Sequence, residues 1–219
     1  MKPLLKLDEA LTPDGRRLIL YRRDSTFHIN VDNQQLMSSE RFGSEEALAE
    51  LGCRGLGAEG RVLIGGLGMG FTLRAALDRL PGSARVVVAE VFPQVVAWNR
   101  QYFAALAGCP LDDRRVKVEQ QDVAELLDRA RYESIMLDVD NGPDALTLDR
   151  NRRLYDVSGL RRIRGALSND GRLAVWSAAE DRGFARRLRS AGFAVTVERV
   201  RAQGRRGARH VIFVARRLD

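Results

Sequence analysis

The sequence is poor in cysteine and contains no long apolar run, and each absence excludes a class of protein. Its two cysteines, Cys53 and Cys109, match no metal-ligand spacing and are too few for a disulfide framework. The two lone histidines, His28 and His210, lie in strand-like runs, where structural or surface roles are expected. No run approaches the roughly 20 apolar residues that cross a bilayer, and the first segment, MKPLLKLDEALTPDG, lacks the apolar stretch of a secretion signal. We therefore expect a reduced, cytoplasmic protein with no metal site and no membrane partner.

Lysine and aromatic residues are also scarce. The chain has 33 arginines but only 3 lysines, and its formal net charge is +7. Such a surplus is compatible with a surface for nucleic acid or another anion, or with arginines that are simply solvated. Aromatic residues make up 6% of the chain, too few for the stacking platforms that bind single strands. Solvated faces are therefore favoured for most of these arginines.

The pattern of the chain changes after about residue 42. Residues 1–42 contain short alternating runs separated by turns at Asp24 and Asp32, which predict a small β-meander or hairpin. Residues 43–219 begin with SEEALAELG, a helix for which Ser44 is expected to be the N-cap. The 219 residues are 45% hydrophobic, enough for one well-filled core.

Strand-like and helix-like segments alternate through the second region. The strand-like runs are Arg61–Gly65, Arg85–Glu90, Val116–Glu119, Ser134–Asp138, Arg172–Ser177, Ala194–Val200 and His210–Arg216. The helix-like segments are Phe71–Leu80, Pro93–Ala107, Val123–Ala130, Leu154–Leu167 and Glu180–Ala191. This alternation predicts an α/β fold with a parallel sheet covered on both faces. No helix separates the last two strands, so they should form an antiparallel hairpin. This is the Rossmann-like layout of class I S-adenosylmethionine (SAM)-dependent transferases, with seven mostly parallel strands.

The strongest local motif is VLIGGLGMG, in which a strand ends in glycines and a helix follows. Gly66, Gly68 and Gly70 form G-x-G-x-G, where a tight turn needs unusual backbone angles and a nucleoside can lie against the backbone. Dinucleotide-binding folds use a similar motif, so the motif alone is weak. The alternative is that the glycines serve only strand–helix packing.

Two acids at the ends of the next strands sharpen this interpretation. Glu90 can accept both ribose hydroxyls, and Asp122 can meet an adenine amino group. Alternatively, Glu90 is a solvated loop acid and Asp122 caps the following helix, or Asp122 does both. The residues predicted to bind the nucleoside are Gly66, Leu67, Gly68, Gly70, Glu90, Val91, Asp122 and Val123.

Two further carboxylates, Asp138 and Asp140, follow the predicted strand that begins at Ser134. Ligands of open α/β sheets bind beyond the carboxyl ends of the strands, where the strand order reverses. For this layout the reversal lies beside the glycine loop, so Asp138 should face that loop, with Asp140 near an incoming acceptor. An attacking amine must lose a proton, which a carboxylate can take. The alternative is that DVDNGP is a loop whose Asp and Asn cap the backbone.

These motifs, in this order, resemble the spermidine synthase family of polyamine aminopropyltransferases. The likeness covers roughly residues 60–180, and the upstream VDNQQLMSSERFGSEEALAEL resembles the gate segment of that family. The resemblance implies SAM or decarboxylated SAM as the cofactor, a small amine as the acceptor, and a homodimer. It assigns the ribose to Glu90, the adenine to Asp122 and the general base to Asp138. At the acceptor and the cofactor tail it places Asp140, Tyr155 and Gln34 or its neighbour Gln35.

The departures from the family gather at the acceptor and at the cofactor tail. Gly68 stands where the family usually has an aspartate that holds the amino group of decarboxylated SAM. Phe92 replaces an acidic residue, and Ser44 replaces a tyrosine before the gate glutamate, Glu45. The Pro- and Tyr-rich C-terminal substrate loop is replaced by AQGRRGARH. Because the nucleoside positions match, the departures leave the transferred group and the acceptor open.

Three functions are compatible with the sequence. The favoured one is transfer of an aminopropyl or methyl group from a SAM-type sulfonium to a small amine, with Asp138 as general base. The second is a SAM-dependent methyltransferase acting on nucleic acid, although the arginine cluster at 161–164 lies on a predicted amphipathic helix and favours a solvated face. The third is a non-catalytic nucleoside-binding homologue.

Overall fold

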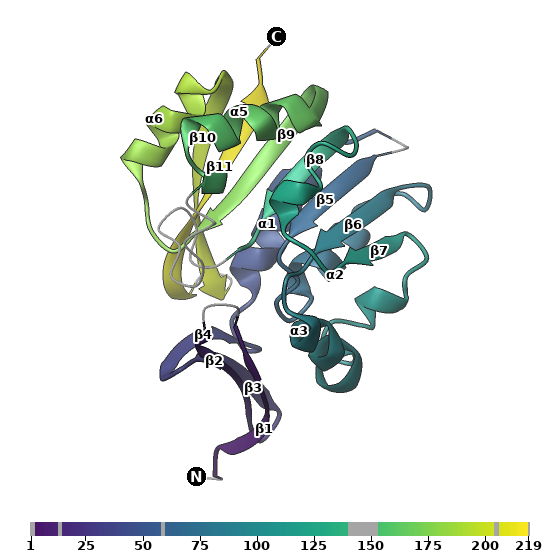
Figure 1. Ribbon diagram of the computed structural model, residues 1–219, viewed down its shortest axis with the longest axis vertical. Coiled ribbons are helices and arrows are strands. Elements are labelled where there is room, and N and C mark those ends of the chain that lie inside the picture. Colours follow the sequence, from purple (N-terminus) through teal and green to yellow (C-terminus); the bar gives the residue numbers. More distant parts are fainter. Residues whose placement is uncertain (1–2, 13–14, 58–59, 140–152, 204–205, 219) are drawn as a thin grey trace.

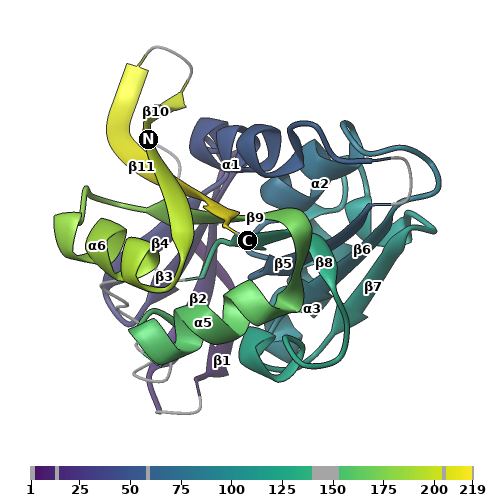
Figure 2. The same cartoon turned by 90° about the horizontal axis from the view of Figure 1, so that it is seen from above.

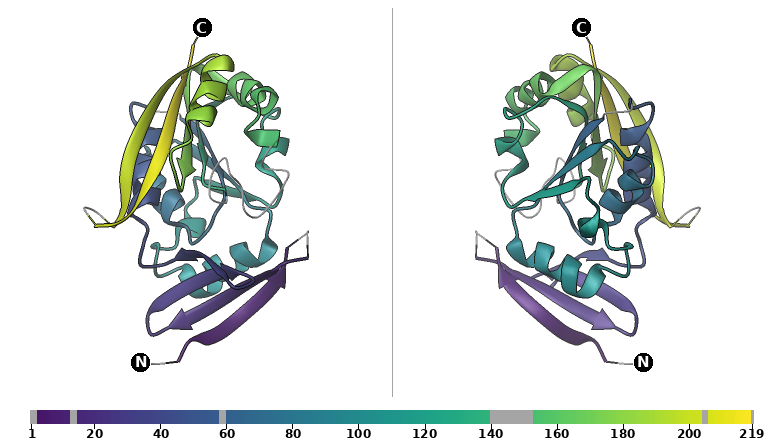
Figure 3. Two further views of the ribbon diagram at one scale, coloured as in Figure 1. Left: turned by 90° about the vertical axis from the view of Figure 1, so that its left-hand side faces the viewer. Right: turned by 90° about the vertical axis from the view of Figure 1, so that its right-hand side faces the viewer.

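The chain forms two β-sheets in sequence order, the smaller one first. The N-terminal sheet lies beneath one end of the larger sheet (Figures 1 and 3). No helix in the described part of the chain is long and apolar enough to cross a membrane. The computed structural model describes residues 3–12, 15–57, 60–139, 153–203 and 206–218.

The N-terminal sheet is an antiparallel meander of four strands in the order β1-β2-β3-β4. Its turns contain Asp24 and Asp32, both with positive φ, as a tight hairpin requires. The predicted meander is confirmed, and it includes an exposed first strand that the sequence did not distinguish. The strands are β1 (Leu5–Leu11), β2 (Arg17–Arg23), β3 (Thr26–Val31) and β4 (Gln34–Ser38).

The larger sheet has seven strands in the order β10-β11-β9-β8-β5-β6-β7. Strands β5 to β9 are parallel to one another, and β11 runs antiparallel to both β9 and β10. The predicted fold class is therefore confirmed, including the terminal hairpin and the reversal of strand order beside β5. The strands are β5 (Arg61–Gly65), β6 (Arg85–Ala89), β7 (Val116–Glu119), β8 (Tyr132–Leu137), β9 (Leu167–Ser177), β10 (Phe193–Gln203) and β11 (Arg206–Arg217).

Helices cover both faces of the larger sheet (Figure 2). Helices α1 (Gly43–Cys53) and α2 (Phe71–Leu77) lie on one face, and α5 (Val157–Ala166) and α6 (Arg182–Ser190) lie on the other. Alternate residues of β5, β6, β8 and β9 enter or pack against the two apolar clusters that result. Burial on both faces explains why these strands read as continuous apolar runs.

The helices predicted between Phe71 and Ala191 all extend beyond the observed ones, and two of them differ most. Helix α3 (Pro93–Trp98) continues only as a π-helical turn, Asn99–Phe103, instead of reaching Ala107. The segment predicted as a helix from Val123 to Ala130 forms a 3₁₀ turn, η3 (Val123–Glu125), followed by turns.

Tertiary hydrogen bonds explain the missing helix after η3. The carbonyl of Ala124 accepts a hydrogen bond from the Arg162 guanidinium, and that of Leu126 accepts one from the Tyr132 hydroxyl. In a helix both carbonyls would bond to the backbone four residues on. Side chains from α5 and β8 thus bond to carbonyls that a helix would use, and the Leu126 carbonyl accepts its backbone bond from Arg129, three residues on, as in a turn.

The predicted N-cap of α1 was also wrong. The helix begins one residue before Ser44, with Phe42 at the N-cap position and no side-chain cap. The amides of Glu45 and Glu46 both donate to the Phe42 carbonyl. The Ser44 hydroxyl instead donates to the Glu45 carboxylate at 2.6 Å. The Ser44 hydroxyl therefore bonds to the side chain of Glu45 and does not cap the helix.

The carboxyl ends of β5 and β8 approach each other at Gly66. The Asp138 amide donates to the Gly65 carbonyl at 2.8 Å, and the Gly66 amide donates to Ala89 at 2.9 Å. Gly66 has a φ of +91°, and a Cβ there would lie 2.3 Å from the Asp138 carbonyl oxygen. Glycine is therefore required at this position by both conformation and space.

Replacing Gly66 by alanine should lower the free energy of unfolding by about 3 kcal/mol, because positive φ and a backbone clash both penalise a Cβ. Gly165→Ala is the matched control, since Gly165 lies in α5 and a methyl group there would meet nothing within 4 Å. The control should gain roughly 0.5–1 kcal/mol from helix propensity. Urea denaturation measures both values. Equal effects of the two substitutions would contradict the close approach at Gly66.

Candidate functional site

Glu90 follows β6 and is held by the backbone around it. Its side chain is only 6% exposed. One carboxylate oxygen accepts from the Leu67 amide at 3.0 Å and the other from the Phe92 amide at 2.9 Å. Burial raises the pKa of Glu90, while these backbone hydrogen bonds act to lower it. The carboxylate is therefore fixed beside the glycine loop, with lone pairs left for further donors.

Asp122 lies at the end of β7 and caps the short turn η3. Its Oδ1 accepts from the Ala124 amide at 2.9 Å, so the capping role considered for this residue is present. Asp122 also lines a hollow that it shares with Glu90. Capping and ligand contact are thus compatible at this position, because an ionised carboxylate offers about four acceptor sites.

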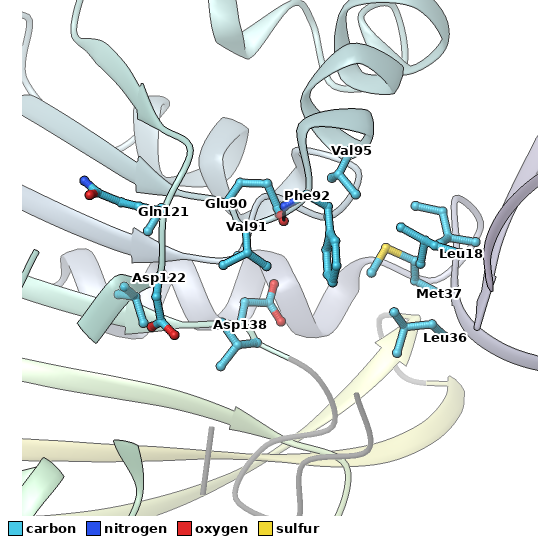
Figure 4. Close-up of a pocket in the computed structure, with 16 residues that line it drawn as sticks. Leu18, Leu36, Met37, Glu90, Val91, Phe92, Val95, Gln121, Asp122 and Asp138 are labelled. Carbon is cyan, nitrogen blue, oxygen red and sulfur yellow. Dashed lines mark hydrogen bonds between the residues drawn. The ribbon is translucent and has the colours of Figure 1, made fainter. Parts of the chain in front are cut away.

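This first hollow holds about 700 Å³ of empty space, counted to its open mouth. It runs from Asp122 past Glu90 to Asp138, and its far end is closed by Phe92 and by Met37 from the N-terminal sheet (Figure 4). Of the predicted nucleoside-binding residues, six line it: Gly66, Gly68, Glu90, Val91, Asp122 and Val123. Its carboxylates are acceptors of the kind that the hydroxyl and amino groups of a nucleoside would need.

Two predicted nucleoside residues lie outside this hollow. The Leu67 amide is used by Glu90, and the Leu67 side chain faces a second hollow. Gly70 is the N-cap of α2 with a φ of +85°, and a Cβ there would lie 2.8 Å from the Asn99 Oδ1 atom. Both residues shape the loop rather than line the first hollow.

Asp138, directly after β8, is positioned by a residue of helix α2. The Thr72 hydroxyl donates to Asp138 Oδ2 at 2.7 Å. Burial raises the pKa of Asp138, and the hydrogen bond from Thr72 lowers it in part. Because both oxygens belong to one planar group, the bond from Thr72 also fixes the direction of the other oxygen. Sequence reasoning missed Thr72, since no local pattern links residues 66 positions apart.

The second hollow adjoins the first and holds about 1100 Å³ to its open mouth. Asp138, Gly68, Met37 and Leu36 line both hollows, so the two spaces meet at these residues. The wall of the second hollow alone includes Gln35, Arg41, Glu45, Thr72, Trp176 and His210.

Glu45 brings a second acid to the side of Asp138 in this hollow. Burial, together with repulsion from the Asp138 charge, raises the pKa of Glu45 to about 7. The Ser44 hydroxyl acts in the opposite direction. Two acids whose pKa values are raised, facing one hollow, form a site that attracts a cation or a proton.

The far wall of the second hollow carries stacked rings. The Trp176 and His210 rings lie 4.8 Å apart between centroids, tilted by 38°. Burial lowers the pKa of His210, which favours its neutral form. His210 was expected to have a structural or surface role, and its packing against Trp176 is compatible with that expectation although it also lines the hollow.

The other residues predicted to bind the acceptor differ in whether they line the second hollow. Gln34 is exposed at the start of β4, whereas its neighbour Gln35 lines the second hollow. Tyr155 is 2% exposed and packs edge-on against Phe184, 5.5 Å between centroids, and it lines neither hollow. Asp140 lies outside the described residues. Of Gln34, Gln35 and Tyr155, Gln35 thus lines the hollow that Asp138 also lines.

Gly68 has an apolar neighbour where the family pattern would supply a charge. Its φ is +52°, and a Cβ there would lie 3.4 Å from the Met37 sulfur. Met37 and Phe92 thus make the end of the first hollow apolar. Within the described ranges, no group of three or more His, Cys, Asp or Glu side chains could hold a metal.

Known proteins resemble this chain in sequence and in fold. No family model matches the chain. The chain is 31% identical over 133 residues to polyamine aminopropyltransferase 2 of Caldanaerobacter subterraneus subsp. tengcongensis. That match covers 57% of this chain and 43% of the relative, so the chain matches less than half the length of that protein.

Solved structures share the fold over nearly all of the chain. Spermidine synthase from Thermotoga maritima superposes with a TM-score of 0.75 at 19% identity, over 98% of this chain and 73% of the other. A spermidine synthase in complex with the transition-state analogue AdoDATO gives 0.74 at 20%, with the same coverage. A probable spermidine synthase from Corynebacterium glutamicum gives 0.69 at 14%, over 99% and 81%. The chain is thus similar in sequence, over just over half of its length, to a polyamine aminopropyltransferase, and it shares the fold of spermidine synthases over nearly all of its length; the resemblance inferred from its motifs is confirmed.

Proposed function

We propose that the chain is an aminopropyltransferase-type enzyme that alkylates a small amine with a SAM-type sulfonium. The observation that carries the proposal is that Asp138 lines both hollows. One hollow has the carboxylates and the glycine loop that suit a nucleoside, and the other has the acids that suit an ammonium group. A group transferred between two ligands must cross at the residues that both spaces share, and Asp138 is one of them.

The residues of the first hollow suit the nucleoside part of such a cofactor. Glu90 would accept the ribose hydroxyls, Asp122 the adenine amino group, and the backbone at Gly66 would lie along the ligand. When bound, the sulfonium supplies an electrophilic carbon and a neutral thioether leaving group. The apolar end formed by Met37 and Phe92 would exclude water from that carbon.

The second hollow would bind and deprotonate the amine. Glu45 and Asp138 attract the ammonium form, and the free oxygen of Asp138 takes the proton as the nitrogen attacks carbon and the carbon–sulfur bond breaks. A raised pKa makes Asp138 a stronger base than an exposed aspartate. Thr72 keeps the carboxylate pointed at the shared space. The repulsion between the two neighbouring carboxylates is offset when the cation binds.

The Asp138→Asn variant tests the base. We expect turnover with a diamine acceptor to fall about 100-fold or more, because the amide cannot accept the proton. Affinity for methylthioadenosine, measured by calorimetry, should change less than threefold. The control is Asp112→Asn, an exposed aspartate in the 3₁₀ turn Pro110–Asp112. Normal turnover in Asp138→Asn would refute the assignment, whereas equal loss in both variants would point to a general effect.

The raised pKa of Glu45 predicts a pH dependence of stability. Its folded pKa of about 7 lies above the 4.5 of the unfolded chain, so the folded state binds more protons between these values. Stability should therefore fall as pH rises from 5 to 8, by on the order of 2 kcal/mol more in the wild type than in Glu45→Gln. Urea denaturation at both pH values measures this difference.

Two comparisons make the pH test specific. Glu46→Gln should change the slope least, because the Glu46 charge is the smallest of the causes that raise the pKa of Glu45. Asp138→Asn should reduce the slope, because it removes the charge that repels Glu45. A slope that survives Glu45→Gln would show that another group titrates.

The residue at position 68 should determine whether the site prefers SAM or decarboxylated SAM. Without an acid at this position, SAM is as acceptable as decarboxylated SAM, and methyl transfer becomes a second candidate function. Gly68→Asp should be tolerated, since aspartate enters the left-handed region more readily than most residues and its Cβ would meet Met37 at ordinary contact distance. We expect calorimetry to show at least a tenfold shift toward decarboxylated SAM. Gly68→Asn, of the same shape but uncharged, should show no shift; an equal shift in both variants would exclude a charge effect.

A further inference from the structure

A concentration of positive charge lies at the amino ends of β5, β6 and β7, away from the two hollows at their carboxyl ends. A hollow of about 1390 Å³, counted to its open mouth, lies there. We call it the basic hollow. The charged residues that line it are six cations and one acid: Arg61, Arg85, Arg114, Arg115, Lys117, Arg129 and Glu119.

The parallel register brings these cations together. Arg61 and Arg85 are partners in the β5–β6 ladder, and the Val86 amide donates to the Arg115 carbonyl at 2.8 Å. Strands β5 and β6 therefore begin with arginines in register, and Arg115, directly before β7, lies at the same level. Adjacent strands are about 4.8 Å apart, and residues in register point to the same face. The sequence hides this row because its members are 24 to 30 positions apart.

The basic hollow exists because no helix covers this part of the sheet in the described chain. The segment after β7 forms only the short turn η3 (Val123–Glu125) and then turns, where a doubly wound fold would carry a longer helix. Val87, on the same face as Arg85, is consequently only partly buried and lines the hollow. Charged side chains occupy the space that an apolar helix face would otherwise fill.

Most of the cations in the basic hollow lack an acidic partner within the described ranges. Arg115 is paired with Asp113, and Lys117 with Glu119 at 2.6 Å. The side chain of Arg114 donates to the Gly82 carbonyl, and that of Arg129 donates to the Gln121 amide oxygen. These two acceptors are neutral, so they leave the charge of both guanidinium groups uncompensated.

For the remaining two cations, no neutral partner of this kind occurs in the described part of the chain either. Among the residues that the structure describes, Arg61 and Arg85 make no ion pair. Like charges gathered in a concave surface repel one another and raise the local concentration of anions.

The chemistry of the basic hollow favours phosphate groups over nucleic-acid bases. Guanidinium groups form bidentate hydrogen bonds with phosphate oxygens. The aromatic residue in the wall, Tyr132, is 2% exposed and donates its hydroxyl to the Leu126 carbonyl, so it offers no ring face for stacking. We propose that the basic hollow binds a compact oligophosphate, a ligand with several phosphate groups close together. This site is separate from the proposed transferase site and does not depend on it.

The test is calorimetric titration of the full chain with inorganic tripolyphosphate at low and at physiological salt. We expect binding by the wild type, and at least a tenfold loss of affinity in the double variant Arg61→Gln/Arg85→Gln. The matched control, Arg161→Gln/Arg186→Gln, removes the same charge from exposed positions on α5 and α6 and should change affinity less than threefold. A thermal melt shows whether each variant is folded.

Three outcomes would overturn the proposal. They are no binding of tripolyphosphate by the folded wild type, equal losses in the two double variants, or no loss in Arg61→Gln/Arg85→Gln. Duplex RNA serves as the competing ligand. If RNA binds more than tenfold tighter than tripolyphosphate and the Arg61/Arg85 variant loses that binding, the ligand is a nucleic-acid backbone and the compact oligophosphate is excluded.

Discussion

The close backbone approach between Gly66 and Asp138 is the constraint on which the site depends. It follows from the parallel pairing of β5 with β8, which aligns Gly65 with Leu137 and directs the next residues toward each other. The Asp138 amide bonds to Gly65, and a side chain at Gly66 would collide with the Asp138 carbonyl. A carboxylate therefore stands at the mouth of the glycine loop. Any ligand that lies along this loop must pass beside it.

Burial of carboxylates has different consequences at three positions of the site. Glu90 accepts hydrogen bonds from backbone amides at both oxygens, so its burial is compensated by the fold itself. Asp138 has the hydroxyl of Thr72 at one oxygen. Glu45 has the Ser44 hydroxyl but also the repelling charge of Asp138, and its pKa reaches about 7. The acids whose burial is least compensated, Asp138 and Glu45, thus line the second hollow, where a bound cation would neutralise their charge.

Sequence patterns predicted the elements well where the signal was local. Runs of β-branched residues located β5 and β7 to the residue, and the glycine and proline positions located the starts of α2 and α3. The helix expected after Asp122 failed for a tertiary reason, because Arg162 and Tyr132 take the carbonyls that a helix would use. That failure also leaves the amino ends of β6 and β7 uncovered. The alignment of the arginines could not be predicted from the sequence either, because the pairing of the strands sets which residues lie side by side.

The sequence by itself determined the fold class, the glycine loop and the acids that end β6, β7 and β8, because each rests on short-range patterns of polarity, conformation and turn chemistry. Only the tertiary structure decided that Thr72 holds Asp138, that Glu45 faces it, and that Met37 closes the space beside Gly68. It also placed Gln35, and not Tyr155, at the second hollow. These contacts join residues far apart in the chain, and strand order and register bring them together through hydrogen bonds that no local pattern specifies.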